Sequence, residues 1–205
     1  MLVLAAALTV FFVTKDIVTP LWRRLWEPWV SSMSDGPRTF WGHLVIWSFP
    51  MAVVSLLSVL WLVHTGRFAA LSLRRSSPQA VRDGLWGALG VVTLSFPVLL
   101  ALGQPMAFGI NFWSIAGNLF SNAYEEIVNR ALVFGAAWYC IGSALGAALI
   151  SGVVFGFTHE QYPPSIQLYV SAVGALFCYV YARSGNLLAP WIAHQISDSI
   201  IDMFF

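Results

Sequence analysis

The sequence has few charged residues. Only 9% of its 205 residues are Asp, Glu, Lys or Arg, whereas a soluble domain carries about a quarter. So few charges cannot cover a water-exposed surface. The 59% share of apolar residues and the mean hydropathy of +0.76 therefore indicate a chain whose solvent is mostly lipid. The net charge of +1 excludes the basic surface that a nucleic-acid partner requires.

Cysteine is also scarce. Cys140 and Cys178 both lie in apolar runs, and two such residues form neither a disulfide framework nor a Cys-based metal spacing. We interpret them as small buried hydrophobic residues. Tryptophan, in contrast, occurs ten times, which is typical of a chain with many residues at membrane–water interfaces.

The apolar segments predict an all-α fold, because each approaches the roughly 20 residues that a spanning helix needs. We expect a polytopic transmembrane helix bundle of about seven spans, with six and eight as the bounds. The first run, Leu2 to Val13, has no basic region before it and no small-residue cleavage site after it, so we expect it to stay attached. The predicted spans are 2–19, 42–64, 86–108, 120–140, 142–160, 166–182 and 186–204.

Two connecting segments carry most of the remaining charge. In residues 20–40, Trp22, Trp26 and Trp29 recur at helical spacing beside two arginines, which predicts a short helix lying in the interface. Residues 65–84 hold four arginines and one acid, which indicates a cytoplasmic loop. We therefore divide the chain into N-terminal spans with this loop, 1–84, and a compact helical core, 85–205.

The first polar cluster in the core is Glu125-Glu126 with Arg130. Charges inside a membrane cost roughly 2.5–3.5 kcal/mol each, so we expect these residues to have a structural or functional role. Glu126 and Arg130 have the i, i+4 order that favours an ion pair. Glu125 points about 100° away from Glu126 and shares its face with Asn129. We therefore expect Glu126 to be structural and Glu125 to be available for proton transfer, unless both acids simply begin an interfacial helix.

The second and third clusters are Phe155 with His159, and His194 with Asp198, each pair at i, i+4. A histidine at a helix end can be a simple interfacial residue, and a buried His–Asp pair can merely satisfy itself. Counting spans, however, brings Glu125, His159, His194 and Asp198 to the same side of the membrane. If the 65–84 loop is cytoplasmic, that side is extracytoplasmic.

The residue types suggest hydrolysis. A carboxylate with a nearby histidine can take a proton from water and so make it a nucleophile. A second histidine with an acid or amide can stabilise the oxyanion that develops on a peptide carbonyl. Glu125, His159 and His194 could instead hold zinc and leave one position for water. The residues alone leave a metal-free and a zinc-dependent mechanism open, and we expect the metal-free one.

These motifs resemble those of the CPBP family, which contains CAAX prenyl proteases and bacteriocin-processing enzymes. The family pattern is Glu-Glu-x-x-x-Arg, then Phe-x-x-x-His, then His-x-x-x-Asn/Asp, and the chain matches it in order between about residues 110 and 205. The resemblance implies a four-helix catalytic core and an intramembrane endopeptidase, glutamate-type or metal-dependent. It also implies a multi-pass protein of a bacterial-type cell membrane.

By the resemblance, Glu125 and His159 would activate water, and His194 and Asp198 would stabilise the oxyanion. Glu126 and Arg130, with Phe155, would support the site. Asp198 stands where some members have Asn, and an ionised Asp can only orient His194. The expected partners are the lipid bilayer and a protein or peptide substrate cut near its C-terminal or membrane-anchor segment.

Three other functions are considered. A CPBP-like membrane protein without catalysis, such as an immunity or assembly factor, would keep the fold. A small transporter or proton relay would also bury acids and histidines, but the repeated halves common in transporters are not visible. A rhomboid-type serine protease would need a Gly-x-Ser-Gly loop, which Gly142-Ser-Ala-Leu-Gly146 does not match.

Overall fold

The computed structural model describes residues 2–64 and 77–205. Over these residues the chain forms seven continuous helices and no strand, which confirms the predicted all-α fold and the number of helices. Much of the predicted basic loop at 65–84, including Arg67, Arg74 and Arg75, lies outside the described residues. The boundary predicted at residue 84 falls inside a helix, α5 (Ser77–Ala101).

The first helix is longer than predicted. The segments α1 (Leu2–Val13), η1 (Thr14–Val18) and α2 (Thr19–Ser31) run as one helix of 30 residues. A separate interfacial helix at 20–40 is therefore wrong. The polar residues inside this stretch do not end the helix, because Lys15 bonds to Glu160 across the bundle at 2.6 Å.

The second helix follows a short turn. It is built from α3 (Asp35–Trp41), η2 (Gly42–Ser48) and α4 (Phe49–His64), and so starts seven residues before the predicted span at 42. The middle segment is π-helical, a geometry that is rare and often marks functional sites.

The remaining helices form the core. They are α5, then α6 (Phe112–Glu126) continued by η3 (Ile127–Phe134) and α7 (Gly135–Ile141), then α8 (Ala144–Phe157), α9 (Pro164–Ser184) and α10 (Leu188–Phe204). Two predicted spans need correction. α5 lies earlier than 86–108, since Gly103 takes a left-handed conformation just after its end. α6 starts before residue 120, because Asn111 caps it by accepting a hydrogen bond from the Ser114 N–H.

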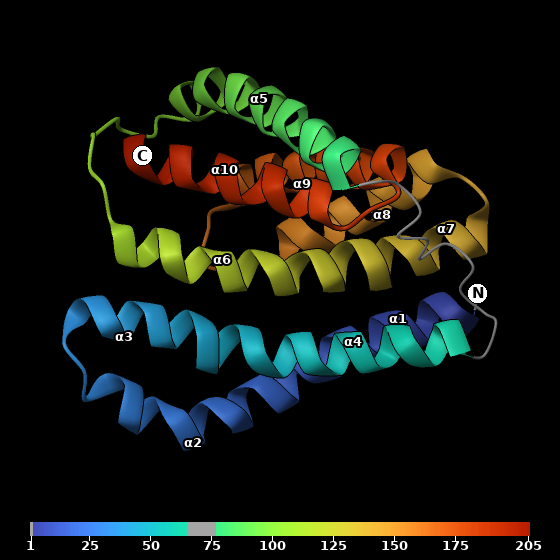
Figure 1. The fold of residues 1–205 in the computed structure, drawn as a ribbon, viewed down its shortest axis with the longest axis horizontal. Helices are drawn as coiled ribbons and strands as arrows, with labels where there is room; N and C mark the ends of the chain where they lie inside the picture. Colours follow the sequence, from blue (N-terminus) through green and yellow to red (C-terminus); the bar gives the residue numbers. More distant parts are fainter. Residues whose placement is uncertain (1, 65–76) are drawn as a thin grey trace.

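Figure 1 shows how these helices are arranged. α1 to α4 form a layer on one side, α6 with η3 and α7 runs along the middle, and α8 to α10 lie beyond it with α5 on the outside. α6 contacts η2 and α3 on one flank and α10 on the other. This single helix therefore joins the N-terminal layer to the core.

Two glycines let α8 and α9 pack closely. A Cβ added at Gly152 would lie 2.5 Å from the Ser171 carbonyl oxygen, and one at Gly156 would lie 2.3 Å from the Gln167 carbonyl oxygen. Small residues at such positions let the backbones of two helices approach closely. This close packing fixes the end of α8, where His159 follows.

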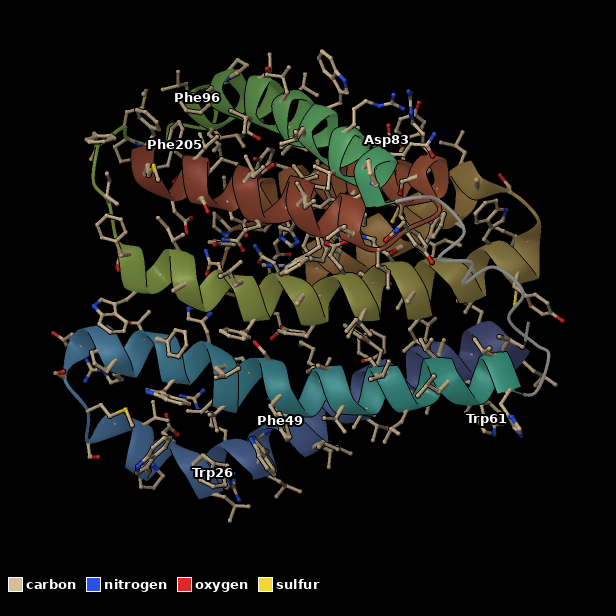
Figure 2. All side chains as sticks on the ribbon, viewed as in Figure 1. Trp26, Phe49, Trp61, Asp83, Phe96 and Phe205 are labelled. Atoms are coloured by element: carbon tan, nitrogen blue, oxygen red, sulfur yellow. The ribbon has the colours of Figure 1, made fainter. Side chains whose placement is uncertain are left out.

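The outer surface is apolar. Trp26, Phe49 and Trp61 lie on the outside of the N-terminal layer (Figure 2) and are 38%, 52% and 52% exposed. Such a surface suits lipid rather than water. In the described part of the chain, four helices are long and apolar enough to cross a membrane: Leu2–Ser31, Asp35–Trp61, Pro78–Ala101 and Pro164–Ser184. The protein is therefore an integral membrane helix bundle.

Candidate active site

The pair Glu126 and Arg130 forms the buried base of the site. Arg130 Nε and Nη2 donate to the two carboxylate oxygens of Glu126 at 2.9 and 3.1 Å, and the side chains are 0% and 2% exposed. The i, i+4 ion pair predicted from the sequence is therefore present. Two-point contact of this kind fixes the orientation of the carboxylate.

Aromatic rings enclose the Arg130 guanidinium. Its centre lies 4.9 Å from the Phe155 ring and 5.4 Å from the Phe177 ring, so both faces contribute cation–π attraction. Nη1 has no hydrogen-bond partner among the described residues. Phe155, predicted to support the site, packs on the arginine.

Glu126 also holds His194, a contact that the sequence did not predict. His194 Nδ1 lies 2.8 Å from Glu126 Oε1. An ionised carboxylate can only accept, so Nδ1 carries the proton and donates. Glu126 thus connects Arg130 on its own helix to His194 on α10, and it sets the direction in which the other ring nitrogen points.

The other nitrogen of His194 faces two acids. Nε2 lies 3.3 Å from Asp198 Oδ2 and 3.8 Å from Glu125 Oε2. A proton on Nε2 would therefore lie between the imidazole and these carboxylates. The Asp198 contact matches the predicted orienting role, and the Glu125 contact connects two of the predicted motifs directly.

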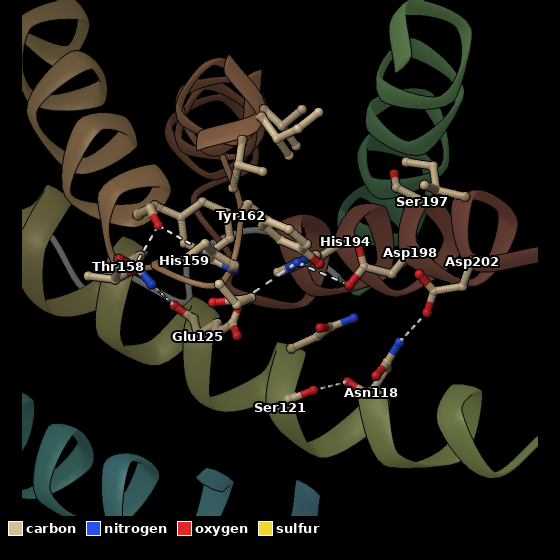
Figure 3. Close-up of a pocket in the computed structure, with 18 of the residues that line it drawn as sticks. Asn118, Ser121, Glu125, Thr158, His159, Tyr162, His194, Ser197, Asp198 and Asp202 are labelled. Atoms are coloured by element: carbon tan, nitrogen blue, oxygen red, sulfur yellow. Dashed lines mark hydrogen bonds and ion pairs between the residues drawn. The ribbon is translucent and has the colours of Figure 1, made fainter. Parts of the chain in front are cut away.

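Glu125 faces a cavity, whereas Glu126 does not. The cavity has a volume of about 860 Å³ and is lined by Glu125, His159, His194 and Asp198 together (Figure 3). The Glu125 side chain remains 17% exposed. The structure thus brings the four residues predicted to be catalytic to one cavity, and it separates the two neighbouring glutamates as their 100° offset implies.

His159 is held at the end of α8. Its Nδ1 lies 2.7 Å from the Phe155 carbonyl oxygen, and since that oxygen can only accept, Nδ1 donates. Nε2 is then left to accept a proton or a hydrogen bond. The Tyr162 ring lies parallel to the imidazole, with centroids 6.0 Å apart. Tyr162 is a cavity residue that the sequence analysis missed.

Polar pairs continue the site along the α6–α10 contact. Asn118 Nδ2 donates to Asp202 Oδ2 at 3.0 Å. Asn118 lies eight residues before Glu126 on α6, and Asp202 lies eight residues after His194 on α10. Halfway between, Asn122 donates to Gln195 at 3.2 Å. The eight residues between the outer two contacts are the same on both helices, and Asn122 reaches Gln195, the residue after His194, so the two antiparallel helices meet in a row of polar contacts.

The N-terminal layer completes the cavity. His43, on η2, lines it and seats its ring against Gly117, where an added Cβ would lie 2.9 Å away. His43 is a second cavity residue that the sequence motifs did not indicate. At the opposite end, Lys15 bonds to Glu160, next to His159, and the ammonium lowers the pKa of this exposed carboxyl group. Neither contact follows from a local sequence pattern.

The arrangement does not present a ready metal site. Among residues 2–64 and 77–205, no three His, Cys, Asp or Glu side chains are grouped so as to hold a metal ion. Both nitrogens of His194 face carboxylates, Nδ1 that of Glu126 and Nε2 that of Asp198, so neither points to an open position for a metal ion. Glu125, His159 and His194 as placed do not fit zinc, and no step below uses it.

The fold and site define a class of protein: a polytopic membrane helix bundle with a carboxylate–histidine cavity. Residues 107–200 match the family described as type II CAAX prenyl endopeptidase Rce1-like. The chain is also 30% identical over 145 residues to YdiL of Bacillus subtilis (strain 168), described as a candidate membrane peptidase. Both matches support a protein of the CPBP family.

The second match covers 71% of this chain and 55% of the relative, so the chain spans about half of that protein's length. No solved structure is significantly similar to the chain.

Proposed function

We propose that the protein is an intramembrane endopeptidase in which Glu125 activates a water molecule. The observation that carries this proposal is the difference between two adjacent glutamates. Glu126 is fully used by Arg130 and His194, whereas Glu125 faces the cavity. A carboxylate that faces a cavity beside histidines is the arrangement that general-base hydrolysis needs.

In the proposed reaction, Glu125 takes a proton from water while the water oxygen attacks the peptide carbonyl carbon. His159 Nε2 hydrogen-bonds to the same water. The carbonyl π bond opens to an oxyanion, and a protonated His194 Nε2 donates to that oxygen. The carbon–nitrogen bond then breaks, and the proton held by Glu125 passes to the departing amine nitrogen.

In this proposal Asp198 has a positioning role. Its carboxylate lies 3.3 Å from His194 Nε2 and, when ionised, cannot donate to an oxyanion. It instead favours the proton on Nε2 that the oxyanion needs. The substrate class that fits a site within a helix bundle is a protein segment close to a membrane, near a C-terminus or membrane anchor.

The test compares the termini of membrane proteins by mass spectrometry, in membranes containing either the wild-type protein or Glu125→Gln. We expect at least one terminus that appears only with the wild-type protein. Glu27→Gln is the matched control, since Glu27 is exposed and paired with Arg23, and it should give the wild-type pattern. Identical termini in all three samples, with equal protein levels, would indicate a CPBP-like partner without catalysis.

A further inference from the structure

Two buried polar atoms in the cavity have no hydrogen-bond partner among residues 2–64 and 77–205. They are Thr19 Oγ1 and Asn129 Oδ1, on residues that are 5% and 3% exposed. Both residues line the cavity beside Glu125. A buried polar group without a partner costs about 1–3 kcal/mol, so such groups call for an explanation. One explanation is a ligand that supplies the missing partners.

The free hydroxyl of Thr19 is unusual for this protein. Hydroxyls within helices commonly donate to the carbonyl one turn back, and here Thr14, Ser95 and Ser197 do so at 2.6–2.7 Å. Thr19 does not. It follows directly on the π-helical segment η1, and its backbone N–H bonds to the Thr14 carbonyl, five residues back. The helix therefore leaves this hydroxyl available to the cavity.

The free oxygen of Asn129 has a fixed identity. The other side-chain atom, Nδ2, lies 3.0 Å from the Glu125 carbonyl oxygen. A carbonyl oxygen can only accept, so the amide cannot be flipped without losing this bond. Oδ1 is therefore the atom left over, and it is an acceptor. It lies one turn beyond Glu125 on the same face of the helix.

The two atoms come from opposite halves of the chain. Thr19 belongs to the first helix and Asn129 to η3 in the core. One turn before Thr19, Lys15 bonds to Glu160 next to His159. This bond connects the first helix to the loop between α8 and α9. This bond fixes the position of the first helix, and with it the Thr19 hydroxyl, relative to His159.

We propose that Thr19 and Asn129 hold the backbone of the substrate peptide across the cavity. Asn129 Oδ1 accepts a peptide N–H next to the bond that is cut, and the Thr19 hydroxyl donates to a peptide carbonyl. An extended peptide carries both groups at every residue, so this contact is independent of side chains. The proposal rests on the proposed function, and it gives the N-terminal layer a substrate-binding role.

The first experiment uses Thr19→Val, which removes the hydroxyl and keeps the shape. The probe is an octapeptide selected from a random-sequence library by retention on immobilised Glu125→Gln protein. We expect Thr19→Val in that background to bind the octapeptide about fivefold more weakly, the factor that one net hydrogen bond gives. The thermal midpoint should stay equal or rise, because the hydroxyl has no partner to lose.

Thr14→Val is the matched control. Thr14 is equally buried on the same helix, but its hydroxyl already bonds to the Val10 carbonyl and it does not line the cavity. We expect a lower thermal midpoint with unchanged octapeptide binding. Full binding by Thr19→Val, or a loss of stability like that of Thr14→Val, would overturn the role of Thr19.

The second experiment replaces single amides of the octapeptide by esters, which removes one N–H at a time. At one position, next to the cleaved bond, we expect Glu125→Gln protein to bind the ester about fivefold more weakly. When Asn129→Ala is added to Glu125→Gln, the amide peptide and the ester peptide should bind with about equal affinity at that position. If the ratio of amide affinity to ester affinity is the same with and without the Asn129 side chain at every position, Asn129 Oδ1 does not accept a peptide N–H. Cleavage by wild-type protein alone tests the proposed function, so the two failures are distinguishable.

Discussion

The strongest prediction concerns the buried pair Glu126 and Arg130. Arg130→Met would keep the length of the side chain and its packing on Phe155 and Phe177, but remove the charge. Glu126 would then be a buried carboxylate that keeps only its contact with His194. Leaving one member of a buried ion pair uncompensated costs about 3–5 kcal/mol.

Glu126→Gln should cost a similar amount, because it leaves the Arg130 cation uncompensated in the same position. The double variant should lose less free energy of unfolding than the two single variants added together, since neither charge is then left without a partner. Contacting residues commonly couple by about 0.5–3 kcal/mol. We expect a value in the upper part of this range, because two hydrogen bonds of 2.9 and 3.1 Å join the side chains.

The measurement is the free energy of unfolding in mixed detergent micelles, titrated with a denaturing detergent. Arg23→Met is the matched control. Arg23 also pairs with a glutamate four residues away, at 2.6 Å, but both side chains are more than 40% exposed. Exposed pairs contribute little, so this variant should be close to wild type. An Arg130→Met protein as stable as Arg23→Met, or strictly additive losses in the double variant, would refute the reasoning.

Three further predictions follow. Gly156→Ala should destabilise the bundle by about 1–3 kcal/mol or more, because the new methyl group would meet backbone atoms of α9; Gly90→Ala, which meets nothing within 4 Å, should be neutral or slightly stabilising in the same unfolding assay. Glu160→Gln should loosen the first helix at neutral pH, seen as a greater distance between a spin label at residue 12, which is exposed on the same helix, and one in the loop after α8. Since Lys15 lowers the Glu160 pKa, the wild-type tether should persist at neutral pH and be lost only as the pH falls through that lowered value. Peptidase activity should survive treatment with a chelator followed by its removal, and a loss restored by zinc alone would contradict the placement of His159 and His194.

The predictions that the structure confirms share a physical basis. The ion pair of Glu126 with Arg130 and the contact of His194 with Asp198 each lie within one helix, where i, i+4 geometry is fixed by the backbone. Once the segments are known to be helical, these contacts follow from spacing alone. The same holds for the 100° between Glu125 and Glu126, which separates the cavity-facing carboxylate from the buried one.

The contacts that the sequence could not reveal lie between helices. The bond from Glu126 to His194 depends on the depth and rotation at which α6 and α10 pack. No local pattern encodes either quantity. His43 lay outside every motif, and its place in the cavity depends on Gly117, which lacks a side chain at the point of contact. Lys15 falls inside the predicted span 2–19, and its partner Glu160 is 145 residues away.

The division of roles between Glu125 and Glu126 follows from the register of α6 and α10. Residue 126 meets residue 194 and residue 118 meets residue 202, so every fourth residue of α6 is used against α10. A shift of α10 by one residue would break each of these contacts together. Residue 125 lies one position outside this row. Its carboxylate lies 3.8 Å from His194 Nε2 on α10 and faces the cavity. Its neighbours one turn to either side, Ser121 and Asn129, also line the cavity. The packing of the two helices therefore leaves, beside a row of polar pairs between α6 and α10, a second row of residues that face the cavity, and Glu125 lies within it.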